Sequence, residues 1–417
     1  MQPDKIELGL ERIQQVAKSA GLDRPSFRII TVAGTNGKGS TVAYCDAMLR
    51  HQGYRTGVYT SPHFIDFNER IVVGNDRVAE AALCEAFDRI DAVRADIPLT
   101  YFEFTTLAAM HCFGAAGIDV AILEVGLGGR LDAVNAWDAE LACVSSIGID
   151  HTDWLGDDRE AIGREKAGVA RKGKILVCGD PDPPQSIATT ASDIGANLLQ
   201  RDRDFSVTRL SETVWRYTDE ACSLELPTPA IKGGWACDNA AVAICAIHRF
   251  TEAEAWPDRD AIEYALQSVT MTGRMQFAKL SGTELILDVA HNRAAAKLLA
   301  DYLRDHPITG ATHAVFGCMQ DKDADAILSA MAPMIDHWCI AEIDYPRAMQ
   351  AAEISSLVNS AELNADLTDK QPDTRVFTSV IQAVHEAVAK SSPDDRIVVF
   401  GSFHVVGPAT ELIDYKH

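Results

Sequence analysis

The stretch Val32–Thr41, which reads "VAGTNGKGST", decides the fold of the first half of this chain. It has the composition of a phosphate-binding loop. It departs from the common pattern of Gly, any four residues, Gly-Lys and then Ser or Thr. Val32 stands where the first glycine is expected, and Gly39 follows Lys38 where a hydroxyl is expected. Three explanations are open: a chance run of glycines, an ordinary nucleotide loop, or a variant loop with its own chemistry.

The residues around this loop favour phosphate binding. The apolar run Phe27–Gly34 is typical of a buried strand, and the segment 40–53 is typical of a helix. A glycine-rich loop between a strand and a helix presents backbone N–H groups to an anion, and Lys38 adds a positive charge. Ser40 and Thr41 open the expected helix, and their hydroxyls can cap it. The alternative, a strand-to-helix turn with a solvated lysine, is weaker in this context.

Beyond the loop, apolar strand-like runs alternate with amphipathic helices, which indicates parallel sheets with helices on both faces. The segment 206–226 differs, because its short runs alternate polar and apolar residues as antiparallel strands do. A second alternating set begins near residues 271–273. We therefore expect an α/β fold. A P-loop parallel-sheet ATPase domain with a small antiparallel sheet spans residues 1–272, and a Rossmann-like α/β domain spans residues 273–417.

The composition argues against several classes of protein. The 417 residues carry a formal net charge of −22, whereas nucleic-acid binding needs a basic surface. No apolar run is long enough to cross a membrane, and the charged first residues lack the apolar core of a signal peptide. The ten cysteines are irregularly spaced, so we expect reduced, mostly buried thiols. We expect a cytoplasmic protein with neither nucleic-acid nor membrane partners.

Polar residues follow three of the expected strands. Ser61, Glu124 and His151 each lie at or just past the end of an apolar run. Because the carboxyl ends of parallel strands line one edge of a sheet, they should converge with the loop at Gly34. A hydroxyl, a carboxylate and an imidazole beside a triphosphate suit Mg²⁺ completed by water and phosphate oxygens. Individually, Ser61 also fits a turn before Pro62 and His151 fits a helix cap. Glu124 is costly to bury unless it is paired or metal-bound.

Four further residues are candidates for a role in the site. Lys166 lies on an amphipathic helix that we expect over residues 157–173, ending at Gly173, where spacing alone favours a surface pair with Glu165. Asp288 ends a strand of the second half, and His291 precedes the next helix. Arg274 lies at the expected domain boundary, where it could reach a phosphate or remain a solvated linker residue.

Taken together, the motifs resemble those of the bifunctional dihydrofolate synthase/folylpolyglutamate synthase family, a branch of the Mur ligase superfamily. The resemblance extends from about Lys5 nearly to the C-terminus, and its long motifs favour the folate branch over the cell-wall branch. The motifs occur in the family's order: "GTNGKGS" (34–40), "TSPHFIDFNERI" (60–71), "LEVGLGGRLDAVN" (123–135), "GIDHTDWLGDDREAIGREKAG" (148–168) and "LDVAHN" (287–292).

The resemblance implies an ATP-dependent amide ligase. ATP would phosphorylate a carboxylate of dihydropteroate or tetrahydrofolate. The amino group of L-glutamate would attack the acyl phosphate and release ADP and phosphate. Such an enzyme must hold two reactants in line and stabilise charge on the transferring phosphoryl group. Its expected partners are these small molecules, and we expect a monomer.

The resemblance also assigns roles to residues. In this family the lysine of the "EKAG" motif, here Lys166, is carbamylated, and His291 matches a histidine near the reaction centre. With Lys38 these two form the implied catalytic set. ATP would be bound by Thr35, Asn36, Gly37, Lys38, Gly39, Ser40, Asn239, Arg274 and Asp288. Mg²⁺ would be held by Ser61, Glu124 and His151. The pterin substrate would lie against Glu7, Leu8, Gly9, Thr100, Tyr101, Phe102, Glu103, Leu131, Asp132 and Ala133.

Two other functions compete with this one. A cell-wall amino-acid ligase of the same superfamily would share the mechanism and use a different acceptor. A nucleotide-binding regulatory module would hydrolyse ATP slowly without responding to small carboxylates. In the ligase interpretation the hydroxyl missing after Lys38 is a family feature, and Ser61 takes over its contact with the metal.

Overall fold

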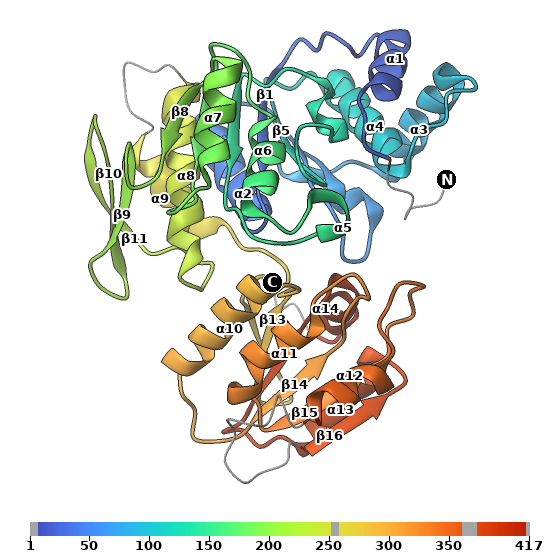
Figure 1. Cartoon of the computed structure of the whole chain (residues 1–417), viewed down its shortest axis with the longest axis vertical. Coiled ribbons are helices and arrows are strands. Elements are labelled where there is room, and N and C mark those ends of the chain that lie inside the picture. Colours follow the sequence, from blue (N-terminus) through green and yellow to red (C-terminus); the bar gives the residue numbers. More distant parts are fainter. Residues whose placement is uncertain (1–6, 252–257, 361–372, 414–417) are drawn as a thin grey trace. The chain divides into compact units, whose positions relative to one another are not determined.

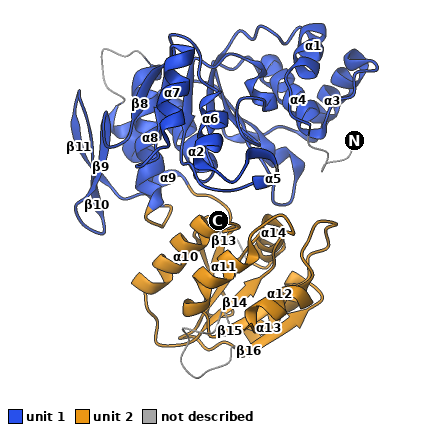
Figure 2. Ribbon diagram, viewed as in Figure 1, with its two compact units in different colours: residues 1–230, 235–269 blue, residues 231–234, 270–417 orange. Residues whose placement is uncertain are grey.

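A computed structural model describes residues 7–251, 258–360 and 373–413 of the chain (Figure 1). The chain divides into two compact units (Figure 2). Unit 1 comprises the residues up to Ala230 together with Trp235–Val269, and unit 2 comprises Ile231–Gly234 and the residues from Thr270 onward. This division lies close to the expected limit at 272/273. The assignment of separate functions to residues 1–272 and 273–417 stays a prediction.

Among the described residues, unit 1 is built on an eight-stranded sheet in the order β4-β3-β2-β5-β1-β6-β7-β8. The six strands β2, β5, β1, β6, β7 and β8 run parallel to one another. At the edge, β3 pairs antiparallel with β2, and β4 pairs antiparallel with β3. The four strands β2, β5, β1 and β6 therefore end side by side at one edge. The strand bounds are β1 Arg28–Ala33, β2 Thr56–Tyr59, β3 Ile71–Val73, β4 Asp76–Arg77, β5 Val120–Glu124, β6 Leu141–Val144, β7 Ile175–Cys178 and β8 Asn197–Gln200.

Helices cover both faces of this sheet, which is why the central strands read as continuous apolar runs. On one face Leu107 and Phe113 of α4 share a core with Ile29 of β1 and Leu123 of β5. On the other face α2 and α8 pack together and contact β5 and β6. The helices of unit 1 are α1 Glu11–Ala20, α2 Lys38–His51, α3 Glu80–Arg94, α4 Tyr101–Ala116, α5 Thr152–Leu155, α6 Arg159–Ala167, α7 Gln185–Ile194, α8 Trp235–Phe250 and α9 Arg259–Ser268.

The predicted antiparallel segment forms a small sheet of β9 Phe205–Arg209, β10 Val214–Asp219 and β11 Ser223–Pro227. Trp215 and Tyr217 alternate with less buried residues along β10, as expected for a strand with one buried face.

Unit 2 contains, within the ranges that the structure describes, a six-stranded sheet in the order β12-β13-β17-β14-β15-β16. Only β12 runs antiparallel to its neighbour. With unit 1, this sheet confirms the expected fold class. The sequence did not indicate β12 or β16, because both are edge strands with partly exposed residues. The elements are β12 Gln276–Leu280, β13 Thr283–Asp288, β14 Thr312–Phe316, β15 His337–Ala341, β16 Asp373–Phe377, β17 Arg396–Phe400, α10 Arg293–Asp305, α11 Ala324–Met331, α12 Ala351–Val358, α13 Val380–Lys390 and α14 Phe403–Thr410.

Two predicted helix limits were wrong. Helix α2 begins at Lys38, before Ser40, and Gly37 at its N-cap has no side-chain cap. Helix α6 ends at Ala167 rather than at Gly173. The reason is tertiary: the Glu165 carbonyl accepts a hydrogen bond of 2.8 Å from the backbone N–H of Arg130. Val169 N–H bonds to the Lys166 carbonyl instead, which tightens the last turn.

All ten cysteines are free thiols and most are buried, as expected. Across residues 7–251, 258–360 and 373–413, no helix combines the length and the apolar character needed to span a bilayer.

Candidate functional site

The loop between β1 and α2 depends on two glycines. Gly34 has φ +150° and Gly37 has φ +85°, a region that side chains rarely adopt. A Cβ atom at Gly34 would overlap the hydroxyl of Ser145, and one at Gly37 would overlap the amide of Asn239. Both glycines are therefore required by backbone conformation and by close packing.

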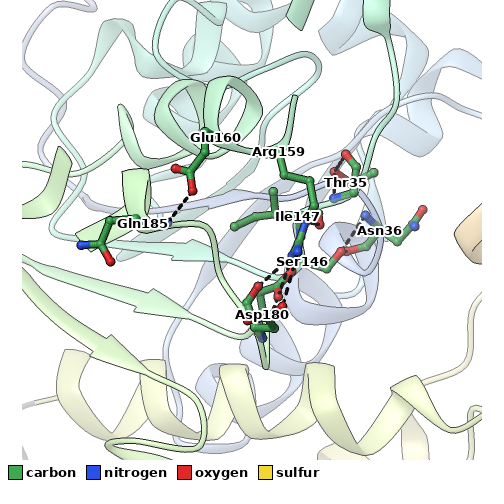
Figure 3. Close-up of polar contacts among 10 residues, drawn as sticks. Thr35, Asn36, Ser146, Ile147, Arg159, Glu160, Asp180 and Gln185 are labelled. Atoms are coloured by element: carbon green, nitrogen blue, oxygen red, sulfur yellow. Dashed lines mark hydrogen bonds and ion pairs between the residues drawn. The ribbon is translucent and has the colours of Figure 1, made fainter. Parts of the chain in front are cut away.

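The segment that follows β6 holds this loop in shape (Figure 3). The backbone N–H of Thr35 donates to the Ser146 carbonyl at 2.8 Å, and the N–H of Asn36 donates to the Ser146 hydroxyl at 3.0 Å. The Ser145 hydroxyl donates to the Asn36 carbonyl at 2.6 Å, and the Thr35 hydroxyl donates to Gly148 O at 3.0 Å. Ser145 and Ser146 are not among the predicted site residues, although two hydroxyl residues directly after an apolar strand are a signal that the sequence contains.

Lys38 is the first residue of α2, and its side chain folds back onto the loop. Its Nζ donates to the carbonyls of Gly34 at 3.0 Å and Thr35 at 3.2 Å. Gly39 and Ser40 follow in the first turn of α2, and Ser40 is buried. The positive end of the helix and this ammonium thus lie at the same loop, the arrangement that binds phosphate.

Asn239 of α8 lies against Gly37 and is 5% exposed. Its Nδ2 is buried and has no hydrogen-bond partner among the described residues. A buried amide without an acceptor costs about 1–3 kcal/mol, so its position facing the loop favours a ligand that supplies the acceptor.

The structure brings Ser61 and Glu124 together. Ser61 follows β2 and Glu124 ends β5, and the Ser61 backbone N–H donates to Glu124 Oε2 at 3.2 Å. Glu124 also lies at the register of Val32, the residue that precedes the loop by two positions, and is 6% exposed. These contacts place a buried carboxylate beside the loop at the carboxyl edge of the sheet.

His151 caps α5 beyond the end of β6. It has φ +54°, and its backbone N–H donates to Asp150 Oδ1 at 2.8 Å. Within the described residues, no three His, Cys, Asp or Glu side chains form a group able to hold a metal ion.

Lys166 is buried, with 3% of the residue exposed. Burial, and next the charge of Lys38, lowers its pKa from 10.5 to about 7. No hydrogen bond or ion pair involves its Nζ within the described parts of the chain. Glu165 instead pairs with Arg130 at 2.8 Å, so the surface pair that spacing alone favours does not form, in line with the different role that the resemblance implies for Lys166.

Asp132 is the second buried ionisable group here. Burial raises its pKa to about 7, against the opposing effect of backbone N–H donors and of the Lys38 charge. Leu127 N–H donates to it at 2.8 Å and Val134 N–H at 3.1 Å. The charges of Lys38 and Asp132 both act on Lys166, so the phosphate loop, the loop at 126–133 and α6 lie near one another.

Helix α6 sits directly on the loop at 126–130, and Gly129 permits this contact. A Cβ atom at Gly129 would lie 2.7 Å from the Glu165 carbonyl oxygen and 3.1 Å from the Lys166 Cα atom. We expect Gly129→Ala to lower the free energy of unfolding by about 1–3 kcal/mol, because backbone must move. Urea unfolding measures this change.

A matched substitution separates this clash from a general glycine effect. Gly114 lies inside α4, and a Cβ atom there meets no atom within 4 Å. Gly114→Ala should raise stability by about 0.5–1 kcal/mol, because alanine favours a helix interior. Equal stabilities of the two variants would contradict the packing argument.

The segments expected to contact a pterin are connected by hydrogen bonds. Gly9 N–H donates to the Leu131 carbonyl at 3.3 Å. Arg12, which was not among the predicted site residues, donates through Nε to Glu103 at 3.2 Å and pairs with Glu7 at 3.0 Å. Leu8 is half-buried and Ala133 is buried beside Asp132.

The start of α4 supplies two aromatic rings. Thr100 and Glu103 form a capping box, which fixes Tyr101 and Phe102 at the first turn. Phe102 packs so close to Gly126 that a Cβ atom there would lie 2.7 Å from its ring. Tyr101 carries the guanidinium of Arg70 at 5.5 Å from its ring centroid.

In unit 2 the structure brings Arg274, Asp288 and His291 together at the end of β13. Asp288 is 6% exposed and accepts hydrogen bonds of 2.8 Å from the N–H groups of Met275 and Ala290. Burial raises the pKa of Asp288, and the charge of Arg274 opposes this. The Arg274 guanidinium lies 5.6 Å from the ring centroid of Phe403, and the His291 ring lies 6.3 Å from the same ring. Arg274 is thus not a solvated linker residue.

Comparison with known proteins gives concordant results. Residues 273–403 match the model of the "Mur ligase, glutamate ligase domain" family. The chain is 39% identical to the dihydrofolate synthase/folylpolyglutamate synthase of Escherichia coli, over 99% of this chain and 92% of that protein. It is 38% identical to the protein of that name from Haemophilus influenzae, over 98% and 94% of the two chains.

Solved structures agree. The structure of Escherichia coli FolC in complex with DHPP and ADP aligns with a TM-score of 0.90 at 39% identity, over 99% of this chain and 95% of that one. A bifunctional folylpolyglutamate synthase/dihydrofolate synthase with Mn, AMPPNP and L-glutamate bound aligns with a TM-score of 0.87 at 41% identity, over 98% and 94%. Identity of this level along nearly the whole chain, on the same fold, shows that this protein belongs to the dihydrofolate synthase/folylpolyglutamate synthase family.

Proposed function

We propose that this protein is an ATP-dependent ligase that adds L-glutamate to dihydropteroate and to tetrahydrofolate and its polyglutamates. ATP phosphorylates the substrate carboxylate, the glutamate amino group attacks the acyl phosphate, and ADP and phosphate leave. The relatives' names and the nucleotide, DHPP and glutamate in their structures support this substrate set. The observation that carries the proposal is the buried Lys166, which makes no hydrogen bond or ion pair among the described residues and lies within reach of the charge of Lys38.

The loop residues bind ATP in this proposal. Gly37 and the start of α2 direct backbone N–H groups at the phosphates, and Lys38 supplies the charge that stabilises the transferring phosphoryl group. Asn239 Nδ2, buried without an acceptor, donates to the nucleotide. Thr35, Asn36, Gly39 and Ser40 shape the loop.

Ser61, Glu124 and His151 would hold Mg²⁺, and AMPPNP and Mn in a related structure support a divalent metal with the nucleotide. A divalent cation there supplies charge neutralisation on the phosphate oxygens. Glu124 is preorganised for this role, since its Oε2 is fixed by Ser61 and the rest of the residue is buried.

Carbamylation of Lys166 is a further part of the proposal. A carbamate forms when a neutral amine attacks CO₂ and loses one proton, so it needs an unprotonated lysine. Burial and Lys38 lower the pKa of Lys166 to about 7, which makes that form abundant at neutral pH. The carbamate is an anion, so the positive charge of Lys38 stabilises it. The same charge repels the ammonium form of unmodified Lys166.

The remaining predicted residues take substrate-facing roles. Phe102 and Tyr101 offer flat surfaces to a pterin ring, and the segments 7–9 and 131–133, joined by a backbone hydrogen bond, border the same region. In unit 2, Arg274 and Asp288 serve the nucleotide and His291 the reaction centre. A monomeric, cytoplasmic enzyme stays our expectation, and sedimentation analysis tests the first point.

One assay separates the candidate functions. The purified protein is given ATP, Mg²⁺ and L-glutamate with dihydropteroate, tetrahydrofolate or a muramyl-peptide substrate, and ADP release and product mass are followed. We expect ADP release that requires both glutamate and a pterin. Turnover only with the muramyl substrate would indicate a cell-wall ligase, and slow hydrolysis indifferent to all three would indicate a regulatory module.

A further inference from the structure

The backbone of Ile147 has unusual partners. Residues 146 and 148 direct their polar groups to the phosphate loop, on the side of β1. The backbone N–H and carbonyl of Ile147 point to the opposite side, the side of β7, where a parallel strand would continue the sheet. The last backbone bond on that side joins Gly179 N–H to the Val144 carbonyl at 2.8 Å. Beyond it two side chains take the place of the missing strand (Figure 3).

Those side chains are Asp180 and Arg159. Asp180 Oδ2 accepts the Ile147 N–H at 2.7 Å, and Arg159 Nε donates to the Ile147 carbonyl at 3.1 Å. Arg159 also donates through Nη2 to Asp180 Oδ1 at 3.2 Å and to the Asp182 carbonyl at 2.9 Å. Asp180 is 5% exposed. The pair therefore satisfies both backbone groups of Ile147 and closes a ring of charge-assisted hydrogen bonds.

Arg159 is also the first residue of α6, the helix that carries Lys166. The two residues are seven positions apart, two helical turns, and so lie on the same face. The next residue, Glu160, accepts the N–H groups of Gln185 at 3.0 Å and Ser186 at 2.7 Å at the start of α7. The first turn of α6 is thereby held to the strand end and to α7, which determines where Lys166 lies.

We infer that Arg159 and Asp180 are positioning residues for the ligase reaction: they hold the strand end that shapes the phosphate loop and join it to the helix of Lys166. This inference rests on the proposed function. In this role neither residue contacts the nucleotide, and each acts through Ile147 and its neighbours. The consequence is a specific one, that ATP binding suffers when the pair is lost while the binding of glutamate and pterin does not.

The experiment compares Arg159→Ala, Asp180→Ala, Asp180→Asn and the double alanine variant with the parent protein. Because each alanine variant removes a charge-assisted hydrogen bond to the backbone of Ile147, KM for ATP and Kd for AMPPNP should rise about tenfold or more. KM for glutamate and for the pterin should stay within about twofold. Asp180→Asn keeps one acceptor for Ile147 and should be milder. The double variant should be little worse than either single one, because the two side chains form one unit.

Arg216→Ala is the matched control. Arg216 lies on β10, its side chain is 40% exposed against 38% for Arg159, and it pairs with Glu225 at 2.6 Å. Arg216→Ala should leave KM for ATP and Kd for AMPPNP unchanged. Thermal unfolding of every variant identifies those that fail to fold.

Folded variants with a lowered unfolding temperature but parental KM for ATP and Kd for AMPPNP would overturn the inference, as would equal increases in all three KM values. AMPPNP affinity, measured by calorimetry, needs no turnover. A parent protein without glutamate-dependent activity would refute the proposed function alone, and the affinities would still test the positioning role.

Discussion

Lys38→Ala is expected to abolish ATP turnover. The Nζ of Lys38 is held over the phosphate loop by the carbonyls of Gly34 and Thr35, at the positive end of α2. Removing it leaves the backbone donors but takes away the charge that the transferring phosphoryl group requires. A preorganised donor of this kind is worth about 10²–10³ in kcat, and glutamate-dependent ADP release measures the loss.

The matched control for this prediction is Lys18→Ala, an exposed lysine in the last turn of α1 that should retain parental kcat. Lys38→Arg keeps a positive charge in a different geometry and should recover little, because a guanidinium does not replace a compact ammonium at this loop. A Lys38→Ala protein with near-normal kcat would refute the assigned role of the loop.

Lys166→Ala should also be inactive, and formate or acetate should partly restore its activity by supplying the missing carboxylate. The carbamate itself is visible in ¹³C NMR of the parent protein under ¹³CO₂. Because the pKa of Lys166 is lowered to about 7, occupancy should rise as the pH rises through about 7, whereas an ordinary lysine needs a pH near 10.5. Lys172→Ala, at an exposed lysine beyond α6, should keep the resonance.

The same lowered pKa has a stability consequence. Between about pH 7 and pH 10.5 the unfolded chain binds a proton at Lys166 that the unmodified folded chain does not. The contribution of Lys166 to the free energy of unfolding therefore increases as the pH rises through that window. The Lys166→Met variant should lack this increase. An active parent protein with unmodified Lys166, seen by intact mass under native conditions, would count against carbamylation.

Much of the fold was accessible from the sequence because its signals are local. The strands β1, β5 and β6 are apolar runs that end in polar residues, and the antiparallel β9–β11 show the two-residue alternation of half-buried strands. The limits of α6 were not accessible in this way. Its last turn ends where the Glu165 carbonyl is taken by Arg130, a residue 35 positions earlier whose backbone approaches only in the folded chain.

The site divides along the same line. "VAGTNGKGST" by itself determined a phosphate loop between a strand and a helix, and the order of the motifs determined the family, because both are written in contiguous residues. Tertiary structure decided the rest. Spacing alone favoured a surface pair of Lys166 with Glu165, whereas the folded chain buries Lys166 near Lys38. This burial is the main cause of its lowered pKa. The role of Arg159 and Asp180 was not predictable from the sequence either, since they act only where β7 leaves β6 and the backbone of Ile147 needs partners from elsewhere in the chain.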